Sequence, residues 1–230
     1  MIRILPLLAV LAASAAPLAA QTSSGTIWFV SGKGEGSKQD TIVQMWKPGV
    51  LRMEMSDAQA RGAGYMIVDS KAQTMTYVMT GEKMYMTRPF PKLGPNATSD
   101  MGELTVTETG RTETIAGVSC RVYEGSRTDK DGKVHKGEAC LAKGVGFQLA
   151  DVLMTMMKNS GAGGSFYNTM KKFKDQDLHA LKWTDLTDGK ANETFVAIKI
   201  DRTPPPESAF QPPSGFTKMD MPANIPLKTP

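Results

Sequence analysis

Apolar and polar residues alternate along the stretch from Val50 to Arg88, and turn-forming segments interrupt the alternation. Successive side chains of a strand point to opposite faces, so this alternation predicts strands with one apolar and one polar face. In the first of them, Leu51 lies on one face and Arg52 and Glu54 lie on the other. The pattern predicts four short strands and a "methionine face" built by Met53, Met55, Met75, Tyr77, Met79, Met84 and Met86.

Further strands are predicted along most of the chain, at Gly25–Val30, Thr41–Trp46, Glu103–Thr109, Arg111–Ala116, Val118–Glu124, Val134–Leu141, Leu178–Leu186 and Glu193–Asp201. Asp131-Gly132 is a hairpin turn signal between two of them. Alternation in the strand that begins at Leu178 predicts that His179, Leu181 and Trp183 share a face. The prolines and glycine of Phe210–Phe216 predict irregular structure whose two phenylalanines pack on the edge of the domain.

The spacing of apolar residues changes at Phe147. Over Phe147–Asn159 it approaches helical spacing, and Phe166, Met170 and Phe173 then repeat at i, i+4 and i+7. We therefore expect two amphipathic helices joined by a glycine-rich hinge at residues 161–164. They are candidates for a cover over the methionine face, with Phe147–Met157 as a lid; a plain helical layer with a loose loop explains the pattern equally well.

The N-terminus has the plan of a secretory signal peptide: Arg3, an apolar run from Ile4 to Ala13, and then small residues. The apolar run is shorter than the ~20 residues that cross a membrane. We expect cleavage after Ala20, export by the general secretion route and a periplasmic location. The predicted organisation is a signal peptide at 1–20, a single domain at 21–220 and a flexible tail at 221–230, with no integral membrane segment after cleavage.

Charge and cysteine content narrow the class of protein. The whole chain carries a net charge of +4, and loss of Arg3 with the signal peptide leaves +3. Because the basic residues are scattered, the sequence does not indicate nucleic-acid binding. The two cysteines, Cys120 and Cys140, would reach an oxidising compartment, and the Asp131-Gly132 turn brings them roughly opposite each other. This pattern favours a disulfide over a redox or metal-binding pair.

Motifs for catalysis, metal binding and cofactor binding are missing from the sequence. It holds no GxSxG, HExxH or phosphate-loop pattern, and its two histidines lack partners at metal-ligand spacing. We therefore expect a protein that is not an enzyme and that has no cofactor and no metal site. A carboxylate pair assembled from distant residues stays open, since spacing cannot reveal it.

The methionine residues suggest alternative functions for the protein. Met53-Glu54-Met55, Met84-Tyr85-Met86 and Met219-Asp220-Met221 are MxM patterns, which in a strand place both sulfurs on one face. Thioethers suit Cu(I), so a copper-binding or oxidant-buffering protein is one alternative. Methionine also fills irregular apolar space, and the same adaptability suits a pocket for variable acyl chains. A structural domain for interactions in the cell envelope, with methionine only in its core, is the other alternative.

Several segments resemble an uncharacterised bacterial exported family, a domain of unknown function with the fold of the lipoprotein carriers LolA and LolB. The similar segments are Lys47–Met55, Tyr65–Asp69, Met75–Tyr77, Lys83–Met86, Glu113–Tyr123, Glu138–Cys140 and Phe210–Phe216. The resemblance spans roughly residues 25 to 220. It implies an open, strongly curved antiparallel sheet closed by helices over an apolar cavity, which in the carriers holds acyl chains.

The residue pattern and the resemblance together predict a mainly β fold of the α+β class, an antiparallel half-barrel with covering helices. The predicted function is non-enzymatic binding of a lipid or another hydrophobic ligand, with an envelope protein as a further expected partner. The expected cavity lining is Met53, Met55, Met75, Tyr77, Met79, Met84, Met86, Leu153, Met157 and Trp183.

Overall fold

The computed structural model describes residues 24–32, 40–55, 64–91, 103–129, 131–146, 149–159, 164–189 and 191–220. The strands are β1 (Gly25–Gly32), β2 (Asp40–Lys47), β3 (Val50–Met55), β4 (Gly64–Asp69), β5 (Thr74–Met79), β6 (Met84–Pro89), β7 (Glu103–Ile115), β8 (Val118–Thr128), β9 (Val134–Lys143), β10 (Leu178–Asp185), β11 (Glu193–Asp201) and β12 (Thr217–Lys218). The helices are α1 (Leu149–Asn159), α2 (Ser165–Asp175) and the 3-10 helix η1 (Glu207–Phe210).

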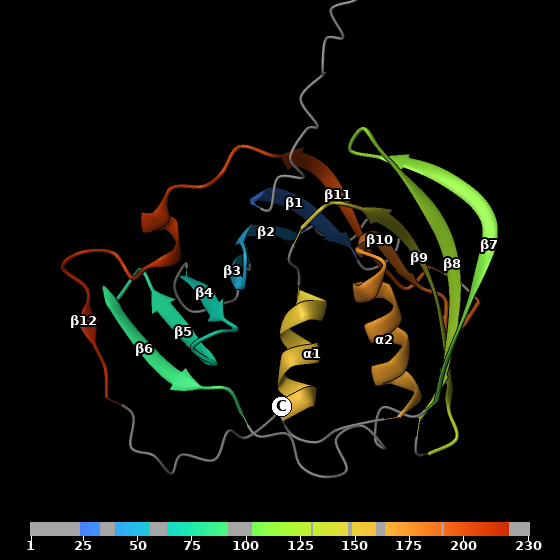
Figure 1. Cartoon of the computed structure of the whole chain (residues 1–230), viewed down its shortest axis with the longest axis horizontal. Helices are drawn as coiled ribbons and strands as arrows, with labels where there is room; N and C mark the ends of the chain where they lie inside the picture. The colour runs from blue at the N-terminus through green and yellow to red at the C-terminus, as the bar shows by residue number, and fades with distance from the viewer. Residues whose placement is uncertain are drawn as a thin grey trace, which may run out of the picture.

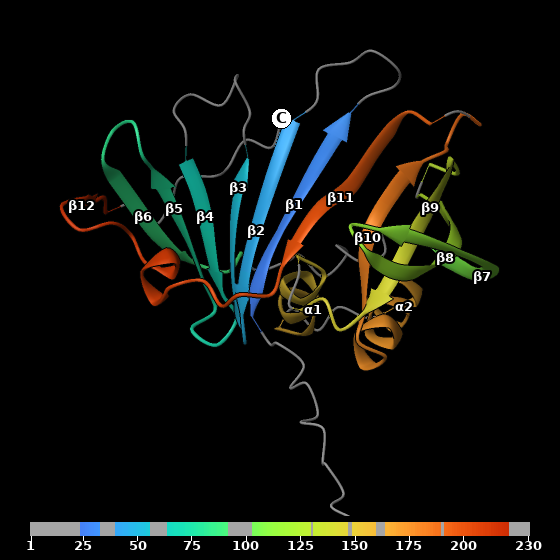
Figure 2. The same ribbon diagram turned by 90° about the horizontal axis from the view of Figure 1, so that it is seen from above.

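All of these strands join one sheet in the order β12-β6-β5-β4-β3-β2-β1-β11-β10-β9-β8-β7. Neighbouring strands pair antiparallel except for β12, which runs parallel to β6. Figure 1 shows the sheet as an arc around α1 and α2, and Figure 2 shows the same arc from above, fanned out between β6 and β7. The predicted mainly β architecture, an open curved antiparallel sheet with two covering helices, is confirmed.

The four strands predicted between Val50 and Arg88 are β3 to β6, and tight turns connect most of them. The turn before β3 uses Gly49 at φ 81°, a backbone angle that glycine adopts without steric cost. The Ser70 hydroxyl and backbone N–H both donate to the Gly49 carbonyl at 2.8 Å and tie this turn to the end of β4. Short connections of this kind fix the register between strands, and the register decides which side chains share a face.

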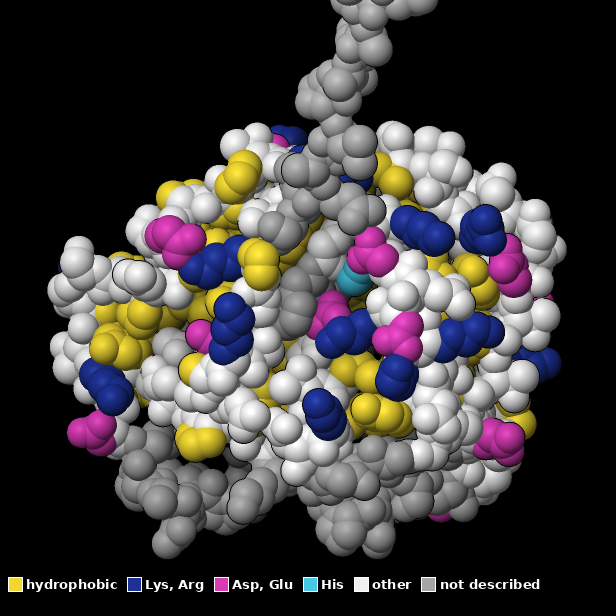
Figure 3. Space-filling view, viewed as in Figure 1, with side chains coloured by type: hydrophobic (Ala, Val, Ile, Leu, Met, Phe, Trp, Pro, Cys, Tyr) yellow, Lys and Arg dark blue, Asp and Glu magenta, His cyan; other side chains and the backbone are white. Residues whose placement is uncertain are grey.

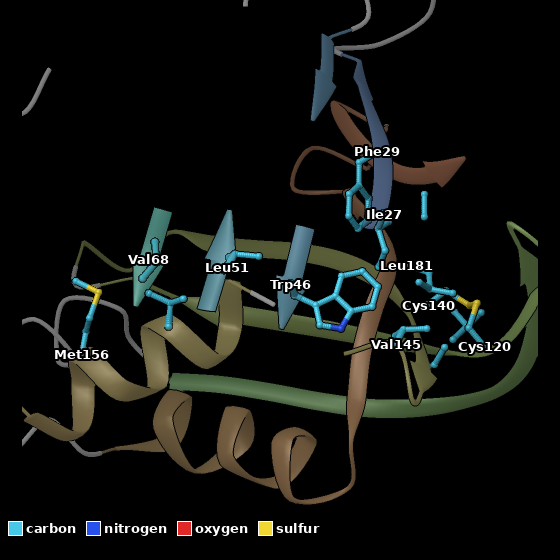
Figure 4. Packing of buried hydrophobic residues seen from close by; sticks show 14 residues of the cluster. Ile27, Phe29, Trp46, Leu51, Val68, Cys120, Cys140, Val145, Met156 and Leu181 are labelled. Carbon is cyan, nitrogen blue, oxygen red and sulfur yellow. A yellow bond between two sulfur atoms is a disulfide. The ribbon is translucent and has the colours of Figure 1, made fainter. Parts of the chain in front are cut away.

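A hydrophobic core cluster joins α1 to the sheet and also includes buried residues of β1, β8, β9, β10 and β11. Trp46, Leu51 and Val68 from neighbouring strands contact a cluster that includes Val152 and Met156 of α1. Figure 4 shows Met156 beside Val68 and Leu51, and Trp46 further along the same row. Because α1 buries these residues, it is a packed layer of the core at this end of the concave face.

A C-terminal segment, residues 204–216, covers the opposite, convex face of β3 to β5. Phe210 is buried, and the Lys47 ammonium lies 5.0 Å from its ring centroid. The Arg52 guanidinium stacks 3.5 Å from the ring centroid of Tyr65 and donates to the Ala209 carbonyl at 2.8 Å. The prediction of irregular structure from Phe210 onward holds up to β12, but Phe210 itself ends η1, a helical turn that the prolines before it did not suggest.

Strands β7 and β8 form a long hairpin. Two strands were predicted on either side of Gly110, whereas β7 runs through as one strand with a register shift between Glu108 and Thr112. Gly110 adopts φ 76° within this bulge, so the glycine kinks the strand and does not end it. The predicted Cys120–Cys140 disulfide is present and joins β8 to β9 with a Cα–Cα distance of 5.4 Å.

The prediction that His179, Leu181 and Trp183 share a face is wrong. A bulge shifts the register of β10 against β9 between Ala180 and Lys182. As a result Trp183, opposite Ala139, lies on the same face as Ala180, and His179 does not. One extra residue reverses every later side chain of a strand, and nothing in the local sequence marks it.

The predicted signal peptide and the tail 221–230 lie outside the described residues. Within the described part of the chain, no helix has both the length and the apolar character that crossing a membrane requires. The single domain at 21–220 stays a prediction, and the described strands from β1 to β12 form one continuous sheet within those bounds.

Candidate functional site

A pocket of about 460 Å3 lies between α2 and the concave face of β7 to β10. We call it the α2 pocket. Most of its lining is apolar, with a few polar groups at one end. The residues that line it are Leu104, Val106, Tyr123, Gly125, Ser126, Arg127, His135, Lys136, Gly137, Glu138, Ala139, Leu141, Phe166, Met170, Phe173, Ala180, Trp183, Asp185 and Thr187. Its volume falls in the range of ~300–1,000 Å3 that is typical of small-molecule sites.

Helix α2 forms the roof of the α2 pocket. Phe166, Met170 and Phe173, which the sequence placed on one helical face, all line the pocket. The ring of Phe173 meets the ring of Tyr123 edge-on, with centroids 5.6 Å apart. At the start of the helix, Ser165 bonds to both backbone groups of Leu104, accepting from the N–H at 2.7 Å and donating to the carbonyl at 3.1 Å. This two-bond contact fixes the first turn of α2 against β7.

Two glycines form the floor of the α2 pocket. Gly125 of β8 lies directly opposite Gly137 of β9, so neither strand projects a side chain there. A Cβ at Gly137 would lie 3.4 Å from the indole nitrogen of Trp183, which means that the indole lies on the glycine backbone. Glycine weakens a strand interior and is typical of places where another group approaches the backbone closely. The paired glycines therefore leave room for the Trp183 indole on Gly137 and for the hollow over Gly125 beneath α2.

Charged groups gather at one end of the α2 pocket. Arg127 lies opposite His135 in the β8–β9 register. His135 shares a hydrogen bond of 2.9 Å with Asp129, and that bond, with backbone N–H donors, holds the pKa of the Asp129 carboxyl below its usual range. The Asp185 carboxylate accepts from the Thr187 hydroxyl and backbone N–H, which lowers its pKa as well. We call Arg127, His135 and Asp185, with Asp129 behind them, the polar end.

The predicted methionine face exists as a face of the sheet. Cross-strand pairs place Met53 opposite Met66, Tyr77 opposite Met86, and Met79 opposite Met84. These side chains are half-buried and continue the concave surface that α1 covers further along. Figure 3 shows hydrophobic side chains exposed over the β4–β6 half of the molecule. The side chain of Met55 lies outside the described residues.

A basic group lies at the edge of the methionine face. Arg88, opposite Met75, donates to the Tyr77 hydroxyl at 2.7 Å, and its guanidinium lies 4.8 Å from the Tyr77 ring centroid. The Arg88 Nε is buried without a hydrogen-bond partner among the described residues. The face is therefore polar at its outer end and apolar towards α1.

The remaining predicted lining residues are divided between two places. Trp183 lines the α2 pocket and is 41% exposed. Met157 of α1 is fully buried and Leu153 is half-buried, and neither lines the α2 pocket. The first two residues of the expected lid, Phe147 and Gln148, lie outside the described residues. The rest of the expected lid, up to Met157, belongs to α1.

Sequence reasoning missed most of the α2 pocket, although two signals were available. The interior glycines of β8 and β9 stand at equal distances from Asp131, so a hairpin loop centred on that residue pairs them. The apolar face of α2 was recognised, but it was assigned to the wrong part of the sheet. Arg127 gave no signal, because a single arginine near a turn is ordinary.

Acidic, cysteine and histidine side chains do not assemble into a metal site in the described part of the chain: no group of three or more of them is close enough. A second, smaller cavity of about 80 Å3 lies between α1, α2 and β10, next to His179. The His179 ring bonds to Asp177 at 3.0 Å. The cavity is too small for more than a few water molecules, at ~30 Å3 each in the liquid.

Residues 31–216 match a family of unknown function, described as "Domain of unknown function (DUF4412)". The chain belongs to this family, which confirms the predicted membership of an uncharacterised family. Among curated proteins, none matches the chain.

Solved structures with a similar fold include an uncharacterised conserved protein from Thermus thermophilus, at 11% identity and a TM-score of 0.50, covering 86% of this chain and 91% of that one. PNGF-II is similar at 9% identity and a TM-score of 0.45, over 86% of this chain and 31% of that one. The MucA/MucB complex from Pseudomonas aeruginosa is similar at 14% identity and a TM-score of 0.41, over 83% of this chain and 56% of that one. At such identities the likeness is one of fold alone.

Proposed function

We propose that this protein binds a lipid or another hydrophobic ligand in the periplasm and carries out no chemistry on it. The observation that supports the proposal is the α2 pocket, an apolar hollow of about 460 Å3 on the concave side of an open sheet. Burial of an acyl chain is worth about 0.8 kcal/mol per methylene, so a long chain can be held without a catalytic group or a metal.

The size of the pocket suits one chain. A water molecule takes ~30 Å3 of liquid and a methylene group is of similar size, so about a dozen carbons fit. The aromatic rings of Tyr123, Phe173 and Trp183 supply flat apolar walls, while Met170 can adapt to chains of different shape. The methionine face lies on the same concave side, and we propose it as the place where a longer ligand continues.

The matched pair Gly125→Leu and Ser119→Leu tests the proposal. A Cβ at Gly125 meets its nearest neighbour, the Thr105 carbonyl, at 3.6 Å, so leucine enters the pocket without a clash at its base. Ser119 is an exposed residue of the same strand outside the pocket. Both variants and the wild type would be purified from the periplasm of an expressing host and analysed by native mass spectrometry.

The proposal predicts a bound species of lipid mass on the wild type and on Ser119→Leu, released by denaturation, and its loss from Gly125→Leu. If all three proteins retain the same lipid, the α2 pocket is the wrong place. If all three proteins show only the polypeptide mass and added dodecyl-chain amphiphiles do not bind, the protein is not a lipid carrier. That result would favour the alternative of a structural domain for interactions in the cell envelope.

A second candidate function is Cu(I) binding or oxidant buffering by the methionine face, and the strand register favours it. Met79 lies directly opposite Met84, and Met86 is next but one along β6 on the same face. Soft thioether ligands from adjacent strands suit Cu(I). Under reducing conditions copper should raise the melting temperature of the wild type, and Met84→Leu combined with Met86→Leu should abolish the rise. No rise in the wild type would exclude this function.

The remaining parts of the proposal are export by the general secretion route, with cleavage after Ala20, and interaction with another protein of the cell envelope. N-terminal sequencing of protein recovered from the periplasm should begin at Gln21. Retention of residues 1–20 in all recovered protein would contradict general secretion with cleavage after Ala20.

A further inference from the structure

The charged residues that line the α2 pocket differ in whether their hydrogen-bonding groups are already used. Glu138 and Lys136 alternate with His135 and Gly137 along β9, so their side chains lie on the other face of the sheet. Glu138 is bound there by Arg111 at 2.6 Å. His135 is bound to Asp129, and Asp185 is bound by Thr187. Glu138, His135 and Asp185 therefore have partners without a ligand, and Lys136 lies on the other face.

Arg127 is different. It is half-buried and lines the α2 pocket, yet among the described residues none forms an ion pair or a hydrogen bond with its guanidinium. A guanidinium presents five N–H donors in a fixed planar arrangement that matches a carboxylate or a phosphate. The free hydrogen-bonding capacity at the polar end therefore suits an anion.

The register aligns Arg127 with the apolar part of the pocket. Along β8 and β9, the facing pairs are Arg127 with His135, Gly125 with Gly137, and Tyr123 with Ala139. Arg127 and Tyr123 are four residues apart on one face of one strand, about 13 Å. A cation, a hollow formed by glycine and an aromatic wall thus follow one another in a straight line beneath α2.

We propose that the α2 pocket binds a single-chain amphiphile with an anionic head group, a carboxylate or a phosphate. The head group pairs with Arg127, and the tail lies over Gly125 and along the Trp183 indole that covers Gly137, with its end against Tyr123 and Phe173. This inference rests on the proposed function, because it assigns the chemical class and the orientation of the ligand. A long-chain fatty acid or a single-chain phospholipid head satisfies the same contacts.

The carboxylates at the polar end define the competing possibility. Asp185 and Asp129 face the same end as Arg127, and a cationic head group would be attracted to them. Each already accepts hydrogen bonds from neighbouring groups, whereas Arg127 has none to lose among the described residues. The anion therefore pairs with a guanidinium that has no partner among the described residues, while a cation would meet carboxylates whose charge neighbouring donors already stabilise.

Competition against the apolar fluorescent probe N-phenyl-1-naphthylamine tests the inference with delipidated protein at pH 7.5. The competitors share a dodecyl chain and differ in the head group: laurate, dodecyl phosphate, dodecanol and dodecyltrimethylammonium. The variants are Arg127→Gln, Arg127→Lys and Arg121→Gln. Arg121 is on the same strand and face but pairs with Glu108 outside the pocket, so it is the control for loss of a positive charge.

We expect laurate and dodecyl phosphate to bind the wild type with about tenfold higher affinity than dodecanol, as measured by displacement of the probe. Charge-assisted hydrogen bonds contribute a free energy of this size. Arg127→Gln should remove this preference and leave dodecanol unchanged, Arg127→Lys should restore part of it, and Arg121→Gln should retain it. Relative affinities for laurate and dodecyl phosphate distinguish the two head groups.

Equal affinity for all four competitors, tighter binding of dodecyltrimethylammonium, or an unchanged anion preference in Arg127→Gln would overturn the inference and leave the proposed function standing. Failure of the wild type to bind the probe or any of the competitors would overturn both.

Discussion

The indole of Trp46 lies directly on the backbone of Gly146. A Cβ built at Gly146 would stand 1.9 Å from the Trp46 indole nitrogen, and one built at Gly25 would stand 2.7 Å from the far edge of the same ring. Trp46 is almost completely buried, and Gly146 precedes α1 by only a few residues. This contact sets where the chain leaves the sheet to form the layer of helices.

Gly146→Ala should therefore lower the free energy of unfolding by about 3 kcal/mol, from overlap with Trp46 and from the left-handed backbone at φ 91°. The control is Gly117→Ala, where φ is 78° and a Cβ would have no neighbour within 4 Å. It carries only the backbone strain and should cost about 1 kcal/mol. Urea unfolding measures both, and equal losses would show that the contact with Trp46 contributes nothing.

The sequence predicted the parts of this fold that depend on repeated local patterns. Alternation placed the methionine face correctly, since the register confirms that Met53, Tyr77 and Met84 share it. The apolar face of α2 followed from its i, i+4, i+7 spacing. Each pattern repeats over several residues, so a single irregularity does not hide it.

The α2 pocket could not be predicted in the same way, because it depends on positions without side chains and on one irregularity that the sequence does not mark. Its floor exists where Gly125 and Gly137 coincide across two strands, whereas a two-residue turn at Asp131-Gly132 would pair Gly125 with Glu138. Trp183 reaches the pocket because the bulge in β10 reverses its side. The choice of which sheet region each helix covers depends on the loops that lead into it, and helical periodicity carries no information about that.

The disulfide between Cys120 and Cys140 should contribute about 3 kcal/mol to the free energy of unfolding. It closes a loop of 20 residues that contains the whole β8–β9 turn, so it restricts the unfolded chain chiefly in this region. Urea unfolding with and without reductant would measure the loss. The double variant Cys120→Ala with Cys140→Ala should be as unstable as the reduced wild type and should not respond to reductant; a response would point to another cause.

The Asp129 carboxylate should make the β8–β9 hairpin sensitive to acid. Its Oδ2 bonds to His135, and its Oδ1 accepts from the backbone N–H groups of Lys133 and Asp131 at 2.9 and 3.0 Å. These bonds lower its pKa from the ordinary 3.8. Because the Asp129 pKa is lower in the folded protein than in the unfolded chain, the ionised carboxylate stabilises the fold. This stabilisation is fully present when the pH is above the pKa of the unfolded chain, and it is lost as the pH falls through the pKa of the folded protein.

Amide hydrogen exchange in residues 122–140 should therefore accelerate as the pH is lowered from about 5 to below the ordinary pKa of 3.8, beyond the change in intrinsic exchange rate. Asp129→Asn should exchange faster than the wild type at the upper end of this range and show a smaller additional acceleration in acid, because asparagine does not titrate. Identical pH profiles for the two proteins would show that Asp129 does not hold the turn.

Arg52 should fasten the C-terminal segment to the convex face of the sheet. It stacks on Tyr65 and donates to the Ala209 carbonyl, and its side chain is only 17% exposed. Arg52→Ala should lower the free energy of unfolding by about 2 kcal/mol, since a cation–π contact and a charge-assisted hydrogen bond are lost together. The segment should also become the first site of proteolytic cleavage, between residues 204 and 216.

Lys199→Ala is the matched control for this prediction. Lys199 also stacks on an aromatic ring, that of Trp28 at 4.5 Å, but no hydrogen bond joins it to the C-terminal segment in the described residues. Its loss should leave the cleavage pattern as in the wild type. If Arg52→Ala is cleaved no faster than Lys199→Ala, burial of Phe210 holds the segment in place without the arginine, and Phe210→Ala should then release it.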